Sequence, residues 1–178
     1  GFKPEIKNAE NFLSAKKYVV CGMGGSGHAA DLLKVWKPEL DVIVRRNYGL
    51  PPLSQGELKE RLAILSSYSG NTEETLDAYR GAKKIGLKMA VMSVGGELIK
   101  MAQRDKTPYI QFPNFNIQPR LASGLGMLGL LKFFGEEKAL EELARLEKTF
   151  NAGNYETFGK ELAARLNGHV PVIYSSEQ

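Results

Sequence analysis

The sequence predicts an α/β fold with a parallel sheet. Five short apolar runs are separated by segments of helix length, and such alternation requires crossover connections between parallel strands. Three of the runs end in turns rich in glycine and serine that open a helical pattern. With 178 residues, 43% hydrophobic and 25% charged, the chain can form one main globular domain with a sizeable core.

The expected strands and helices alternate along the first two thirds of the chain. The strands are expected at 18–23, 41–46, 62–67, 88–93 and 108–112. The helices between them are expected at 26–37, 71–84 and 97–104, where apolar residues recur three or four positions apart.

Further helices are expected at both ends. Residues 4–15 fit a helix with Ile6, Phe12 and Leu13 on its inner side. After Pro119 follow three more helical patterns. They are an apolar segment rich in small residues at 120–134, an amphipathic one at 136–150 and a last one at 154–167.

The domain organisation follows from these elements. Residues 1–150 are expected to form the main domain, including the N-terminal helix, and 151–178 to add a helix and a strand. The strand pattern at 169–178 either opens a second, similar unit or completes the first sheet at its edge. A first residue Gly1 in place of Met suggests a fragment or a remnant of expression.

Charge and cysteine content argue against several classes of function. The net charge of +4 comes from scattered basic pairs, so nucleic-acid binding is not expected. Cys21 is the single cysteine, which excludes an internal disulfide. Without a secretory or long apolar segment, we expect a cytoplasmic protein with no membrane contact.

The turn after the first expected strand has the spacing G-x-G-x-x-G at Gly22, Gly24 and Gly27. This spacing alone suggests a dinucleotide fold, in which an acidic residue should follow the second strand. The sequence has Arg45 and Arg46 there, which disfavours NAD and leaves an NADP-dependent oxidoreductase as an alternative.

Other residues near this turn are weaker candidates. Ser26 adds a hydroxyl at the start of the helix. His28 is either an acid or base, or a side chain pointing sideways from the helix. With only His28 and His169 in the chain, Cys21 fits a buried small residue better than a nucleophile.

The turn after the third expected strand, SYSGNT, has more hydroxyls than a turn requires. Ser67, Ser69 and Thr72 lie just before a helix, whose first amides are unpaired and carry partial positive charge. Gly70 permits a sharp turn toward a ligand. This pattern predicts a site for one anionic group, and a phosphate monoester fits it.

Three more features frame this prediction. Asn71 and Glu74 have the spacing of an N-cap and its capping-box partner. The turn at 93–100 either lines the same crevice or is only a connection. Arg120 either meets a phosphate or sugar hydroxyl, or covers the end of a helix.

Together these segments resemble one protein family. GMGGSG at 22–27, SYSGNTEET at 67–75, the Gly-Gly turn and the QPR segment are similar to the first sugar isomerase (SIS) domain of bifunctional phosphoglucose/phosphomannose isomerases. The resemblance spans most of 17–134. It implies a flavodoxin-like three-layer sandwich with a five-stranded parallel sheet and extra C-terminal helices.

The resemblance also implies a substrate and a reaction. A sugar 6-phosphate is expected to contact Gly25, Ser26, Ser67, Ser69, Thr72 and Arg120. The family converts glucose 6-phosphate or mannose 6-phosphate to fructose 6-phosphate without metal or cofactor, in a site between two SIS domains that is often completed by dimerisation. The family's histidine, glutamate and lysine lie in or beside the second domain, so the catalytic residues of this chain are unknown. We therefore expect the phosphate-gripping half of an isomerase; the alternative is a non-catalytic sugar-phosphate sensor.

Overall fold

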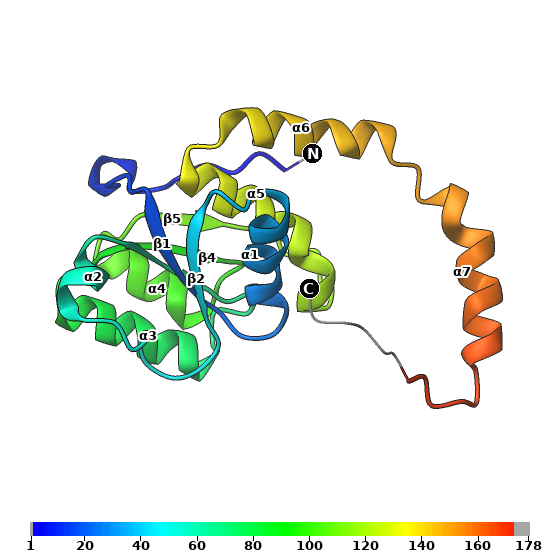
Figure 1. The fold of residues 1–178 in the computed structure, drawn as a ribbon, viewed down its shortest axis with the longest axis horizontal. Helices are drawn as coiled ribbons and strands as arrows, with labels where there is room; N and C mark the ends of the chain where they lie inside the picture. The colour runs from blue at the N-terminus through cyan, green and yellow to red at the C-terminus, as the bar shows by residue number, and fades with distance from the viewer. Residues whose placement is uncertain (1, 173–178) are drawn as a thin grey trace. The chain divides into compact units, whose positions relative to one another are not determined.

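A computed structural model describes residues 2–172, apart from the side chains at 147 and 148. The chain forms two compact units, Gly1–Glu141 and Glu142–Gln178, and each is described by itself. The first unit is a three-layer sandwich, with helices on both faces of one sheet (Figure 1).

The sheet has five parallel strands in the order β2-β1-β3-β4-β5. Their bounds are β1 Lys17–Cys21, β2 Asp41–Arg45, β3 Leu62–Ser66, β4 Lys88–Ser93 and β5 Tyr109–Gln111. Every residue of the central β3 is buried, as expected for a strand that is covered on both faces. Strand β2 lies on one side of β1, and β3, which follows β2 in the chain, lies on the other side. The strand order therefore reverses beside β1. In sheets of this order, ligands bind at the carboxyl ends of the strands near that reversal.

Different helices cover the two faces of the sheet. On one face lie α1 Gly25–Trp36 and α5 Ser123–Phe134, which touch where Gly126 faces Ala29. On the other lie α2 Gln55–Lys59, α3 Glu73–Lys84 and α4 Gly96–Arg104, whose apolar side chains form one core cluster with β1, β3 and β4 (Figure 1). The predicted α/β/α class is therefore confirmed.

The helix expected at 4–15 is wrong. Only the short 3-10 helix η1, Ala9–Asn11, forms there. Lys7 instead makes an antiparallel bridge to Tyr109 of β5, through two backbone hydrogen bonds of 2.8 and 3.0 Å. Asn8 has a left-handed backbone (φ 54°) and donates its side-chain amide to the Thr107 carbonyl. This long-range pairing with the edge strand prevails over local helical periodicity.

One helix was not expected from the sequence. In α2, the Ser54 hydroxyl accepts the Glu57 amide, and the Glu57 carboxylate accepts the Ser54 amide. This reciprocal capping box stabilises a helix of only five residues.

The remaining elements follow the expected segments closely. After a 3-10 helix, η2 Pro119–Ala122, come α5, α6 Glu137–Thr149 and, in the second unit, α7 Gly153–Leu166. No strand forms at 169–172, and the rest of the expected strand at 169–178 lies outside the described residues. The assignment of 151–178 to the start of a second domain stays a prediction. Within the described part of the chain, no helix is long and apolar enough to cross a membrane.

Candidate phosphate-binding site

A pocket of about 500 Å³ opens at the carboxyl edge of the sheet. Three segments far apart in the sequence form it: the start of α1, the loop after β3 at 67–72 (the β3 loop) and the segment 118–120. The lining residues are Met23, Gly24, Gly25, Ser26, Tyr68, Ser69, Thr72, Gln118, Pro119 and Arg120. Five of the six residues expected to contact substrate thus surround one cavity.

Glycine allows the first wall of the pocket to form. At Gly24 the backbone has φ 48°, a conformation that favours glycine. A side chain at Gly25 would meet the carbonyl of Pro119 and the amide of Arg120 at 2.7 Å. The start of α1 and the segment 118–120 are therefore in direct backbone contact, which brings Arg120 to the pocket.

The hydroxyls of the pocket already accept hydrogen bonds from the backbone. Ser26 Oγ accepts the Tyr68 amide at 3.0 Å, and Ser69 Oγ accepts the Asn71 amide at 3.2 Å. Each hydroxyl has one proton, and these bonds do not use it. Both serines can therefore donate toward a ligand in the pocket.

Ser67 lies beneath the loop and not on the pocket wall. It is only 1% exposed, its Oγ accepts the Gly70 amide at 3.0 Å, and it lies 2.8 Å from Thr72 Oγ1. Because Ser67 already accepts from Gly70, it is well placed to give its own proton to Thr72. In that arrangement Thr72, which lines the pocket, keeps its own proton and can donate it to a ligand.

The electrostatics of the pocket also suit an anion. Arg120 is the one charged residue among the described residues of its wall. The N-termini of α1 and α3 lie beside the pocket, and a helix N-terminus carries partial positive charge. A cavity lined by donors and one cation, without a carboxylate, favours a phosphate group.

The turn between β4 and α4, residues 94–95 (the β4 loop), supports the β3 loop from behind and does not line the pocket. Val94 donates its amide to the Tyr68 carbonyl, and Leu98 donates to the Gly70 carbonyl. A side chain at Gly70 would overlap the Gly95 carbonyl oxygen. The two alternatives for this turn are thereby decided in favour of a supporting role.

The expected capping box of Asn71 and Glu74 is wrong. Thr72 is the N-cap residue of α3, and its side chain makes no capping bond. Asn71 Oδ1 instead accepts the Glu97 amide at the start of α4, at 2.9 Å. Asn71 faces the neighbouring loop because Gly70 turns the chain there with φ 74°.

Tyr68 and Gln118 are among the lining residues that the sequence reasoning missed. Tyr68 contributes its backbone amide to Ser26, and its buried hydroxyl has no hydrogen-bond partner among the described residues. Gln118 lies on the wall next to Arg120. The available signal was their position within SYSGNT and QPR.

The other candidate residues lie away from the pocket. Burial raises the pKa of the Cys21 thiol to about 12, so it stays protonated and behaves as a small core residue, as expected. His28 is exposed on α1 and does not line the pocket. His169 belongs to the second unit.

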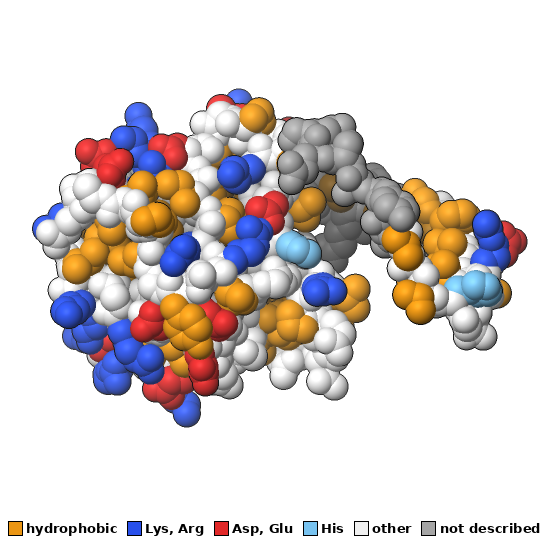
Figure 2. Space-filling view, turned by 60° about the horizontal axis from the view of Figure 1, so that its bottom comes forward, with side chains coloured by type: hydrophobic (Ala, Val, Ile, Leu, Met, Phe, Trp, Pro, Cys, Tyr) orange, Lys and Arg blue, Asp and Glu red, His pale blue; other side chains and the backbone are white. Residues whose placement is uncertain are grey.

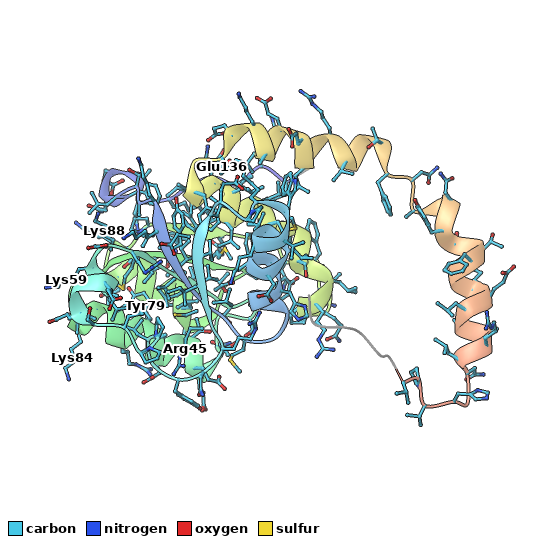
Figure 3. The ribbon with its side chains drawn as sticks, viewed as in Figure 1. Arg45, Lys59, Tyr79, Lys84, Lys88 and Glu136 are labelled. Carbon is cyan, nitrogen blue, oxygen red and sulfur yellow. The ribbon has the colours of Figure 1, made fainter. Side chains whose placement is uncertain are left out.

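The arginines after β2 have structural partners. Arg46 forms an ion pair with Asp31 of α1. Arg45, which is labelled in Figure 3, donates to the Tyr48 carbonyl at 2.7 Å. Neither lines the pocket. The arrangement therefore gives no support to the NADP alternative.

The strand order is that of a flavodoxin-like doubly wound fold with a polar pocket at the carboxyl edge of its sheet. This is the fold and site that the resemblance to a sugar isomerase (SIS) domain implies. Within that class, the chain is a relative of the bifunctional phosphoglucose/phosphomannose isomerases.

Sequence comparison supports this assignment. A bifunctional phosphoglucose/phosphomannose isomerase of Caldicellulosiruptor bescii is 34% identical in an alignment of 174 positions. The alignment covers 89% of this chain and 50% of that protein. The enzyme of that name from Aquifex aeolicus is 32% identical over 94% of this chain and 52% of its own length. The chain thus spans about half the length of these curated relatives. No family model matches it.

Among solved structures, one similar chain is a putative phosphosugar isomerase of Clostridium difficile, and the match covers 90% of this chain and 45% of that chain. Its sequence identity is 16% and its TM-score 0.47.

Proposed function

We propose that the pocket binds the phosphate group of a sugar 6-phosphate, and that the chain is the substrate-gripping half of an aldose–ketose isomerase. The observation that carries this proposal is the set of hydroxyls from Ser26, Ser69 and Thr72 around one cavity beside Arg120. Both serines accept a backbone amide and keep their own protons for a ligand. The relatives supply the substrates by their names: a phosphoglucose and a phosphomannose.

Gripping the phosphate contributes to catalysis at a distance. Binding energy gained at the phosphate positions the sugar carbons C1 and C2 against a base, and so lowers the barrier. A general base must lie within hydrogen-bond reach of the C2 proton. None of the described residues that line the pocket is a carboxylate, histidine or lysine.

We assign the missing proton-transfer groups to a second SIS domain, or to a partner in a homodimer. Support comes from the relatives, which are about twice as long as this chain. The isolated chain then binds sugar phosphates without isomerising them. Its single cysteine, kept as a thiol, supports a place in the cytoplasm.

A sugar-phosphate sensor is the second candidate. The observation that favours it is the same lack of a proton-transfer group on the described wall of the pocket. An assay of the full-length protein for the conversion of fructose 6-phosphate to glucose 6-phosphate separates the two candidates. Activity favours the isomerase, and binding without activity favours the sensor.

Calorimetry with fructose 6-phosphate tests the binding. We expect binding to the native chain and about tenfold weaker binding by Ser69→Ala, which loses one hydrogen bond to a charged group. Ser14→Ala, at an exposed serine outside the pocket, is the matched control and should bind normally. Equal binding of unphosphorylated fructose, or no effect of Ser69→Ala, would contradict the proposal.

A further inference from the structure

A second groove lies between α3 and α4, on the outer side of the helical layer and apart from the phosphate-binding site. Its volume is about 520 Å³. The lining residues are Tyr79, Arg80, Lys83 and Lys84 of α3 and Glu97, Met101 and Arg104 of α4. Four of these seven side chains are cationic and one is anionic.

Asp105, at the end of α4, neutralises part of this charge. It lies 2.7 Å from Lys83 and 3.0 Å from Arg104, and accepts the Tyr79 hydroxyl at 3.1 Å. These partners, Arg104 first, lower the pKa of Asp105 far below its usual range, so it stays ionised. Counting Asp105 and Glu97, the groove therefore has four positive and two negative charges.

The surplus charge belongs to Arg80 and Lys84. They stand four positions apart on one face of α3, both are exposed, and neither forms an ion pair with another described residue. In Figure 3 Lys84 reaches outward from the helical layer, whereas Tyr79 lies within it. Figure 2 shows many Lys and Arg side chains at the lower left of the α/β unit, with acidic ones among them.

The basic side chains are not needed to cap the two helices. At the end of α3, the Gly86 and Leu87 amides donate to the carbonyls of Lys83 and Ala82. At the end of α4, two amides close the helix in the same way. The Lys106 and Thr107 amides donate to the carbonyls of Gln103 and Ala102, respectively. Both ends are therefore closed by backbone Schellman motifs, and Arg80 and Lys84 are not needed to cap either helix.

We infer that the groove between α3 and α4 binds a polyphosphate group, either free or carried on a nucleotide. Its cations are spread along two helices, which suits several charges better than one phosphate. It offers ammonium and guanidinium groups in place of the hydroxyls that surround the sugar-phosphate pocket. The volume is that of a small-molecule site.

The test is a titration of the full chain with inorganic pyrophosphate and, separately, with ATP. Saturating fructose 6-phosphate is present throughout, so that the other pocket is occupied. Amide chemical shifts should change around Lys83, Lys84 and Arg104. Binding should weaken about tenfold in the double variant Arg80→Ala/Lys84→Ala.

A control variant removes equal charge elsewhere. Lys34→Ala/Lys59→Ala replaces two exposed lysines outside the groove and should bind polyphosphate normally. Tighter binding of ATP than of pyrophosphate indicates a nucleotide; equal binding indicates the polyphosphate group alone. An equal loss in both double variants, or shifts spread over all surface lysines, would mean general ionic attraction and overturn the inference. Loss of fructose 6-phosphate binding alone bears on the proposed function, not on this groove.

Discussion

The β3 loop and the β4 loop are similar in composition but differ in their surroundings. Each joins the end of a strand to a helix on the same face of the sheet, and each has a serine near a glycine. In the β3 loop the serine is Ser69, whereas beside the β4 loop it is Ser93, the last residue of β4. Yet Ser69 is exposed at a pocket wall, whereas Ser93 is fully buried. A hydroxyl in such a turn is therefore a ligand group in one place and a structural group in the other.

The hydrogen bonds explain the difference. Ser93 Oγ accepts the Gly95 amide at 3.2 Å and lies 3.0 and 3.3 Å from the carbonyls of Gly95 and Tyr68. Its donor and acceptor capacity is thus satisfied inside the protein. Ser69 accepts a single amide and keeps its proton. What distinguishes a binding hydroxyl is the unused proton, not the residue type.

The largest expected effect comes from separating the two loops. In Gly70→Ala the new methyl group would overlap the Gly95 carbonyl oxygen, at a residue with φ 74°. We expect a loss of about 3 kcal/mol or more in the free energy of unfolding, because both loops must shift. Urea denaturation measures it.

Gly86→Ala is the control for this substitution. Gly86 has a similar backbone (φ 69°), but no atom lies within 4 Å of its added methyl group. It should cost only about 1 kcal/mol, the strain of a left-handed residue. If the two variants were equally stable, the close packing of the two loops would not matter and the comparison would fail.

Intermediate effects are expected from substituting Ser93 and Ser69. The first substitution should affect stability, and the second should affect binding. Ser93→Ala should lower the free energy of unfolding by about 1–2 kcal/mol, since the Gly95 amide loses its partner. Its affinity for fructose 6-phosphate should change little. Ser69→Ala should leave unfolding within about 0.5 kcal/mol of the native value while it weakens binding. Denaturation and calorimetry on both variants check this, and matching profiles would remove the distinction between the loops.

The strands could be predicted because each contains a short apolar run, which is buried throughout in the central β3. For β3, residues Leu62–Ser66 form the observed strand where 62–67 was expected. The helix expected at 4–15 failed because its competitor, the bridge from Lys7 to Tyr109, joins residues about a hundred positions apart. Local periodicity contains no information on such a pairing.

The site could be predicted only in part, for a similar reason. The hydroxyls of Ser69 and Thr72 were recognisable because they crowd a strand-to-helix turn. The sequence does not show that Ser67 lies beneath the loop, or that Asn71 faces α4. Both depend on how the β4 loop packs against the β3 loop, which follows from the strand order.

The smallest expected effect is that of pH on the affinity for fructose 6-phosphate. It sharpens the contrast between the two loops. The hydroxyls of Ser26, Ser69 and Thr72 act as donors, so the pocket should prefer the phosphate dianion over the monoanion. The dianion of a phosphate monoester takes up one proton near pH 6 and becomes the monoanion, so the dianion fraction falls about twofold from pH 7 to pH 6. Affinity for fructose 6-phosphate should fall by that factor, as calorimetry at the two pH values would show. Ser93 does not line the pocket, so the Ser93→Ala variant should show the same pH dependence of affinity as the native chain. If the affinity of the native chain did not change between pH 7 and pH 6, the pocket would bind the monoanion as well as the dianion.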